Sequence, residues 1–175
     1  FQKAKKLVAN GGLGSPEMAY LYEFRTPFKF DWQYDAARSG GTLAEKNIHH
    51  FDIFNWMFDA NPVSVYASGG QNVIKRGDIV DNAWVTVNYA GGQRAMLGVC
   101  LFAPIQIRQF GLAGSAAYME DCSPHGTIGS NAYSLKTWRK ESLGHRAVPS
   151  VFTECFDFTM TDYLKHTRNA VRDFA

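Results

Sequence analysis

The feature that most constrains this chain is a pair of alternating segments joined by two glycines. Residues 82–89, N-A-W-V-T-V-N-Y, and residues 94–101, R-A-M-L-G-V-C-L, each place apolar side chains at every second position. Gly91 and Gly92 lie between the segments and mark a tight turn. Since successive side chains of a strand point to opposite faces, the pattern predicts an antiparallel hairpin with one apolar face.

Further strand-like segments surround this hairpin, and helix-like segments lie towards both ends of the chain. This arrangement predicts one α+β domain over residues 1–175, built as an open, mostly antiparallel mixed β-sheet with helices packed on one face. The expected strands are residues 17–25, 63–68, 82–89, 94–101, 105–112, 116–119 and 132–138, and the expected helices are residues 1–10, 42–58 and 151–174.

The other face of the expected sheet also carries apolar side chains. Tyr66, Trp84, Met96 and Cys100 lie on this face, which the helices would not cover. Monomeric soluble proteins rarely expose an apolar patch of this kind. We therefore expect a second copy of the chain to cover the face, which makes a homo-oligomer the simplest assembly.

Composition argues against several classes of function. The formal net charge is +2 and the basic residues are dispersed, so no nucleic-acid surface is predicted. No apolar run reaches the roughly 20 residues of a membrane-spanning helix, and no signal peptide is evident. The three cysteines are widely spaced without a C-x-x-C pair, which is typical of reduced thiols in the cytoplasm.

Residues 39–56, S-G-G-T-L-A-E-K-N-I-H-H-F-D-I-F-N-W, hold the strongest candidate site. Thr42, followed three residues later by Glu45, predicts a capping box at the start of a helix. On that helix Glu45, His49 and Asp52 are spaced by four and three residues, which brings them to one side. A histidine near carboxylates is a common arrangement for proton transfer. We therefore interpret the segment as half of an active site. The apolar stripe of the same helix comprises Ile48, Phe51, Phe54 and Phe58.

Other interpretations of these residues remain open. The pattern E-x-x-x-H-x-x-D also fits a helix whose polar side faces water, with Glu45 as a cap. Glu45 and His49 resemble a metal-ligand pair, but His50 points to a different side and no second ligand cluster follows, so no metal is predicted. An aromatic loop over residues 26–41 leads into the segment, and its rings, among them Trp32, either plug the core or line a cleft.

Several motifs, in order, resemble those of one family. W-Q-Y-D followed by S-G-G in residues 32–41 resembles the "W-R-x-D…G-G-G" approach to that family's active-site helix, and E-K-N-I-H-H-F-D in residues 45–52 resembles its "D/E-x-x-x-H-x-x-D". Residues 11–14, 81–92 and 110–119 match its glycine-containing steps. On these motifs the chain resembles the C-terminal domain of the glucose–fructose oxidoreductase and inositol dehydrogenase (Gfo/Idh/MocA) family.

The resemblance implies the substrate-binding and catalytic half of an NAD(P)-dependent oxidoreductase that acts on a sugar, polyol or related hydroxyl compound. The family's acid/base histidine matches His49, and an acid beside it matches Glu45. The substrate-binding positions carried over are Trp32, Gln33, Lys46 and Asp52. NAD or NADP would be bound mainly by an N-terminal Rossmann domain, since neither a G-x-G-x-x-G loop nor the family's E-K-P motif occurs in this sequence. This chain alone is therefore expected to be inactive.

Departures from the family pattern bear on the substrate. Gln33 stands where the family often has Arg, Thr42 where a third Gly is common, and Glu45 where some members have Asp. Lys46 does not match the family's catalytic lysine, because no Pro follows it. Two other functions stay open: a non-catalytic binding or oligomerisation module of the same architecture, and an NAD-dependent lyase or glycosidase.

Overall fold

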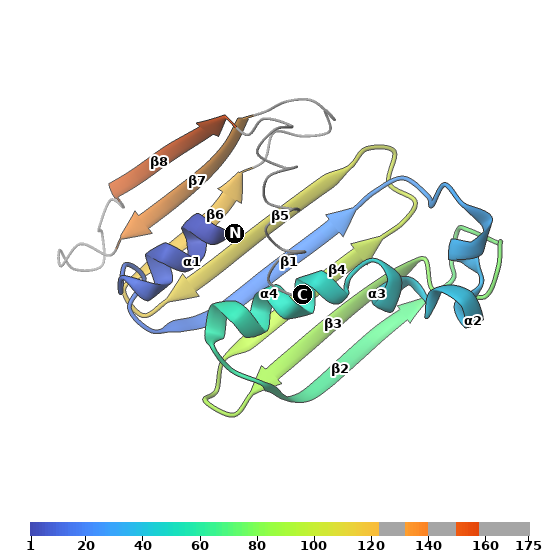
Figure 1. The fold of residues 1–175 in the computed structure, drawn as a ribbon, viewed down its shortest axis with the longest axis horizontal. Helices are drawn as coiled ribbons and strands as arrows, with labels where there is room; N and C mark the ends of the chain where they lie inside the picture. Colours follow the sequence, from blue (N-terminus) through green and yellow to red (C-terminus); the bar gives the residue numbers. More distant parts are fainter. Residues whose placement is uncertain (123–131, 140–149, 158–175) are drawn as a thin grey trace, which may run out of the picture.

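The computed structural model describes residues 1–122, 132–139 and 150–157. Its strands are β1 (Pro16–Phe24), β2 (Pro62–Gly70), β3 (Asn82–Tyr89), β4 (Arg94–Cys100), β5 (Ile107–Gly114), β6 (Ala117–Cys122), β7 (Ala132–Arg139) and β8 (Ser150–Asp157). They form one eight-stranded sheet in the order β2-β3-β4-β1-β5-β6-β7-β8 (Figure 1). Neighbouring strands are antiparallel except for the parallel pair β1 and β4, so the sheet is open and mixed, as predicted.

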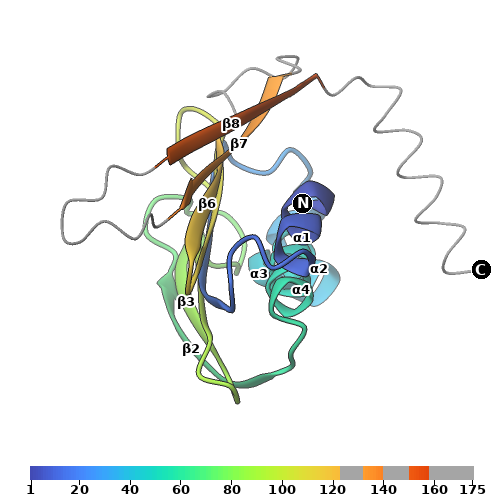
Figure 2. The same cartoon turned by 90° about the vertical axis from the view of Figure 1, so that its left-hand side faces the viewer.

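The helical elements lie together on one side of this sheet (Figure 2). They are α1 (Gln2–Ala9), the 3-10 turn η1 (Asp31–Tyr34), α2 (Ala36–Ser39), α3 (Thr42–Glu45) and α4 (Ile48–Phe58). The α+β class with helices on one face is therefore confirmed. None of the helices in the described ranges has the length and apolar character needed to cross a lipid bilayer.

The predicted hairpin is present as β3 and β4, and its alternation defines the core. Val85 pairs with Leu97 and Val87 with Ala95, and all four side chains are almost fully buried on the helix side. Phe54 of α4, which has no exposed surface, belongs to the same core. Burial of apolar area at about 25 cal/mol per Å² makes this layer the main source of stability.

The single helix predicted over residues 42–58 is instead two helices, α3 and α4, with a break at Lys46 and Asn47. The predicted capping box is also absent. Gly41 holds the N-cap position of α3 at a φ of 82°, and the hydroxyl of Thr42 donates to the carbonyl of Val80 at 2.5 Å. Thr and Asn side chains readily bond to groups outside the helix, which favours helix ends over a continuous helix.

Two further expectations differ from the structure. Ile48 of the predicted apolar stripe is 53% exposed, and His50 takes a buried place on the core side of α4 instead. The expected helix over residues 151–174 is wrong for its first part, because residues 150–157 form β8 and pair with β7. The β-branched and aromatic residues of that stretch favour a strand once a partner edge is available. Residues 158–174 lie outside the described part of the chain.

The loop between β2 and β3 is organised by the buried carboxylate of Asp81. It accepts hydrogen bonds from the backbone N–H groups of Asn72, Val73 and Ile74 at 2.7–3.0 Å and from the side-chain amide of Asn82 at 2.8 Å. Burial alone raises the pKa of Asp81, but these donors outweigh it and lower the pKa to about 2. The charged form therefore holds the loop closed.

We predict that Asp81→Asn lowers the free energy of unfolding by roughly 1–3 kcal/mol at pH 7, because the amide cannot accept all of these bonds. The folded pKa lies below the ordinary value of 3.8, so the stabilisation is complete above that value and is lost as pH falls towards 2. Urea denaturation from pH 7 to pH 2.5 measures both effects. The exposed Glu17→Gln is the control, and an equal gap between Asp81→Asn and wild type at every pH would contradict the prediction.

Candidate functional site

The candidate site centres on the first turn of α4, which packs on β1. His49 lies on the exposed side of this turn, whereas His50 is 7% exposed and faces the sheet. The sequence prediction that the two histidines point to different sides is therefore confirmed. The exposed position leaves the imidazole of His49 accessible to a ligand or to another domain.

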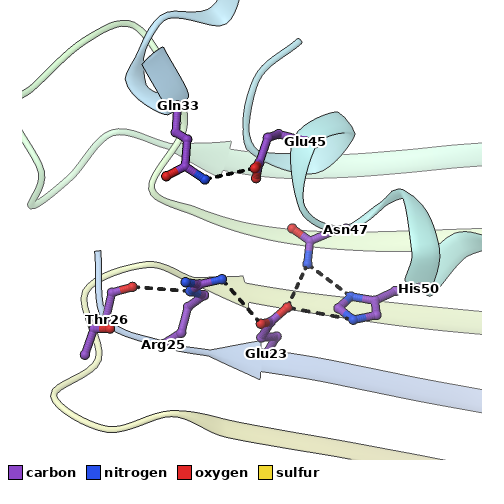
Figure 3. Close-up of polar contacts among 7 residues, drawn as sticks. All are labelled: Glu23, Arg25, Thr26, Gln33, Glu45, Asn47 and His50. Atoms are coloured by element: carbon purple, nitrogen blue, oxygen red, sulfur yellow. Dashed lines mark hydrogen bonds and ion pairs between the residues drawn. The ribbon is translucent and has the colours of Figure 1, made fainter. Parts of the chain in front are cut away.

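Glu45 does not share a continuous helix with His49, since it is the last residue of α3. Its Oε1 instead accepts a hydrogen bond of 2.9 Å from Nε2 of Gln33 (Figure 3). Oε2 of Glu45 is buried and has no hydrogen-bond partner among the described residues. Glu45 is thus fixed at one oxygen and keeps the other as an unused acceptor.

The aromatic loop supplies the partner of Glu45. Gln33 belongs to η1, and its Oε1 accepts from the backbone N–H of Phe30 at 3.1 Å, so both ends of its amide are engaged. Phe28 and Tyr34 are buried with an edge-to-face ring contact, whereas Trp32 is 38% exposed. Two rings of the loop therefore plug the core, which is the first of the two alternatives, whereas Phe30 and Trp32 are exposed and do not line the hollow beside η1.

The remaining predicted site residues are placed separately. Asp52 is exposed one turn after His49, and Lys46 is partly exposed in the break between α3 and α4. Among the described residues, no hydrogen bond or ion pair joins His49, Asp52 or Trp32 to Glu45. The structure thus brings together Gln33 and Glu45, while the roles of His49 and the others stay predictions.

Among the described residues no metal cluster defines the site, and the hollow nearby is lined by other residues. Within the described ranges, no three His, Cys, Asp or Glu side chains gather closely enough to hold a metal ion. A shallow hollow of about 320 Å³ lies between η1 and the loop after β2. Arg76 lies over the ring of Tyr34 there, 4.5 Å from its centroid, and pairs with Asp31. None of the predicted site residues lines this hollow.

Sequence reasoning missed a buried polar cluster beneath the start of α4, formed by Glu23, Asn47 and His50 (Figure 3). Asn47 Nδ2 lies 3.0 Å from Nδ1 of His50 and 3.5 Å from a carboxylate oxygen of Glu23. Burial lowers the pKa of His50 to about 4, and the nearby positive charges of Arg108, Lys46 and His49 add to the effect. Periodicity in β1 offered no clear signal, because the row of Glu17, Ala19, Leu21 and Glu23 has a glutamate at each end and only Glu23 is buried.

Comparison with known proteins identifies the family. The model of the GFO/IDH/MocA C-terminal domain matches residues 1–120. The chain belongs to the Gfo/Idh/MocA family. One relative, the uncharacterised oxidoreductase YrbE of Bacillus subtilis (strain 168), is 30% identical over 125 residues, which cover 67% of this chain and 36% of YrbE. The chain thus spans little more than a third of that relative's length.

Solved structures share the fold of this Gfo/Idh/MocA domain. GenD2 from gentamicin A biosynthesis, in complex with NAD, has a TM-score of 0.69 and 18% identity, with 97% of this chain and 49% of GenD2 covered. The super-repressor mutant of Gal80p from Saccharomyces cerevisiae has a TM-score of 0.72 and 11% identity, with 99% and 48% covered. At these identities the similarity shows only a shared fold. GenD2 is described as a protein of gentamicin A biosynthesis with NAD bound, whereas Gal80p is described as a super-repressor mutant.

We predict that Gln33 and Glu45 are energetically coupled, because each satisfies a polar group of the other at a partly buried position. A double-mutant cycle with Gln33→Leu and Glu45→Leu is expected to give a coupling energy of about 0.5–1.5 kcal/mol in urea denaturation. Pairing Gln33→Leu with Asp52→Leu is the matched control and should give additive effects. Additivity in the first cycle would show that the contact contributes nothing.

Proposed function

We propose that this domain is the substrate-binding and catalytic half of an NAD(P)-dependent oxidoreductase that acts on a sugar, polyol or related hydroxyl compound. The supporting observation is the exposed imidazole of His49 on α4, within a chain of the Gfo/Idh/MocA family. The sequence contains no G-x-G-x-x-G pattern of the kind that cradles a pyrophosphate. Holding NAD or NADP is therefore attributed to an N-terminal domain, where the nicotinamide would accept the hydride.

In this proposal His49 handles the proton. A secondary alcohol that loses hydride from carbon must also lose the proton of its hydroxyl group to become a carbonyl. An imidazole has an ordinary pKa of about 6.5, which suits it to take that proton near neutral pH and to return it in the reverse reaction. Its exposure on α4 allows a substrate to approach from the side opposite the sheet.

The other predicted residues would recognise the substrate. Oε2 of Glu45 has no hydrogen-bond partner among the described residues and would accept from a substrate hydroxyl once the side chain moves enough to expose this buried atom, while Gln33 contacts Oε1. Gln33 is neutral where the family often has Arg, which favours an uncharged hydroxyl compound over a carboxylate. The exposed ring of Trp32 offers an apolar surface for the C–H face of a sugar, and Asp52 and Lys46 would contact further hydroxyl groups.

A non-catalytic module remains the second candidate, and the likeness to Gal80p favours it. That protein is named as a repressor, yet its fold matches this chain with a TM-score of 0.72. Fold alone therefore does not establish catalysis. Turnover that depends on His49 supports the oxidoreductase, whereas a full-length protein that binds a sugar without oxidising it supports the module.

The open face of the sheet is proposed as the contact with a second copy. Tyr66 is 70% exposed, Trp84 50% and Met96 41%. A side chain at position 98 would clash with the ring of Trp84, and one at position 111 would clash with Tyr20, so the glycines at these positions let both rings lie flat. A flat aromatic surface of this kind suits face-to-face packing against another sheet, with the two sheets about 10 Å apart.

We predict that His49→Gln lowers kcat of the full-length enzyme by roughly 10²–10⁴-fold, the usual contribution of a general acid/base. Stability should change by less than about 0.5 kcal/mol, because the side chain is exposed. Reduction of NAD or NADP at 340 nm, with myo-inositol, D-glucose and D-xylose as probes, measures turnover. Lys6→Gln on the exposed side of α1 is the control, and an unchanged kcat for His49→Gln would reject the role.

We predict that Trp84→Arg weakens self-association by at least tenfold in Kd, because it places a charge at the centre of the apolar face. Light scattering and sedimentation between about 0.1 and 10 μM measure the assembly. Val73→Arg, at an exposed position in the loop after β2, is the matched control and should leave assembly unchanged. A wild-type protein that is monomeric over this whole range would refute the contact.

A further inference from the structure

The buried cluster of Glu23, Asn47 and His50 lies directly beneath the turn that carries His49. Asn47 and His50 lie on either side of His49 in the sequence, and both approach the same carboxylate oxygen of Glu23, at 3.5 Å and 3.7 Å. Glu23 is in β1, and Figure 3 shows it below the junction of α3 and α4. One side chain of the sheet thus contacts the residues that flank the proposed acid/base.

The hydrogen-bond geometry of this cluster defines which atoms donate and which accept. Asn47 Nδ2 can only donate, so Nδ1 of His50 accepts and the proton of this ring lies on Nε2, the nitrogen that faces Glu23. Oδ1 of Asn47 has no hydrogen-bond partner among the described residues, so the amide is held only through its nitrogen. The orientation of Asn47 therefore depends on Glu23 and His50.

Burial keeps His50 neutral, and nearby positive charges add to the effect. Arg25 Nη1 lies 3.8 Å from the second oxygen of Glu23, and Arg108, Lys46 and His49 exert positive charge on His50. Since burial also lowers the pKa of His50, the ring stays uncharged near pH 7 and its tautomer does not change over the working range of an enzyme. The protonation state of His50, and with it the pattern of contacts in the cluster, therefore stays the same under those conditions.

Stability alone does not account for this arrangement. Glu23 is 4% exposed and lies on the same face of β1 as Ala19 and Leu21, where an apolar side chain would pack without desolvating a charge. Buried charged groups are often replaced by apolar residues of similar volume at no cost in stability.

We propose that Glu23, Asn47 and His50 are positioning residues that fix the first turn of α4, and with it the imidazole of His49, relative to Glu45. This inference rests on the proposed function of His49. Gln33 holds Glu45 from the loop side, and Glu23 holds the α4 side through Asn47 and His50. The break at residues 46–47 makes both anchors necessary, because no continuous helix fixes the spacing of Glu45 and His49. A displacement of about 1 Å at a catalytic group can cost roughly 100-fold in rate.

The test uses the full-length enzyme with NAD or NADP and the best substrate among myo-inositol, D-glucose and D-xylose. Glu23→Leu should lower kcat by roughly 10–100-fold while KM changes less than about threefold. Glu23→Gln, which keeps an acceptor for Asn47, should restore most of kcat. If Glu23→Leu does not fold, His50→Phe, which keeps the ring volume and loses both contacts, should give the same selective loss of kcat.

The control is Phe54→Leu, a substitution in the apolar core one turn further along α4 that removes packing and leaves the polar side chains of the cluster unchanged. It should lower the thermal midpoint and leave kcat of the folded enzyme unchanged. The positioning role is overturned if Glu23→Leu and His50→Phe keep wild-type kcat, or if Phe54→Leu loses kcat to the same extent. The proposed function itself is rejected if His49→Gln is active or if no probe is turned over. If His49→Gln is inactive and Glu23→Leu is fully active, only the positioning role is rejected.

Discussion

The structure depends on the position of β1 in the middle of the sheet. This strand pairs in parallel with β4 and antiparallel with β5, so its backbone is bonded on both edges and its side chains must divide between the two faces. Leu21 and Glu23 face the helices, whereas Tyr20 and Tyr22 stack on the open face, 5.4 Å apart. A shift of one residue in its register would exchange the two sets. The helical layer and the aromatic face thus depend on the same register.

Local patterns in the sequence were sufficient to predict most of the fold. The β3–β4 hairpin was predictable because its turn residues and its alternation lie within 20 residues of one another. The break between α3 and α4 was not, since Asn47 turns inward towards a carboxylate 24 residues away on β1. The strand character of residues 150–157 depends likewise on the free edge of β7. Contacts between distant segments decide whether such a stretch forms a helix or a strand. Periodicity within one segment carries no information about those contacts.

The candidate site was predictable in its residue types and less so in its geometry. The pattern of Glu45 and His49 could be recognised, and the exposure of His49 agrees with the side on which the pattern placed it. Spacing by four residues, however, implies one helical face only where the helix is continuous. The Gln33–Glu45 hydrogen bond joins a loop to a helix end and leaves no periodic signal. Glu23 shares its row of β1 with Glu17, and the alternation alone does not distinguish the buried glutamate from the exposed one.

The two faces of β1 also relate the site to the assembly. Glu23 beneath α4 and the aromatic pair of Tyr22 and Phe24 on the open face are adjacent residues of one strand, and the two rings lie 5.8 Å apart. Packing of a second copy on those rings would hold β1 rigid, and a rigid β1 holds the carboxylate that contacts Asn47 and His50. Self-association and the geometry of His49 would then depend on one strand, although the two sites lie on opposite faces of the sheet.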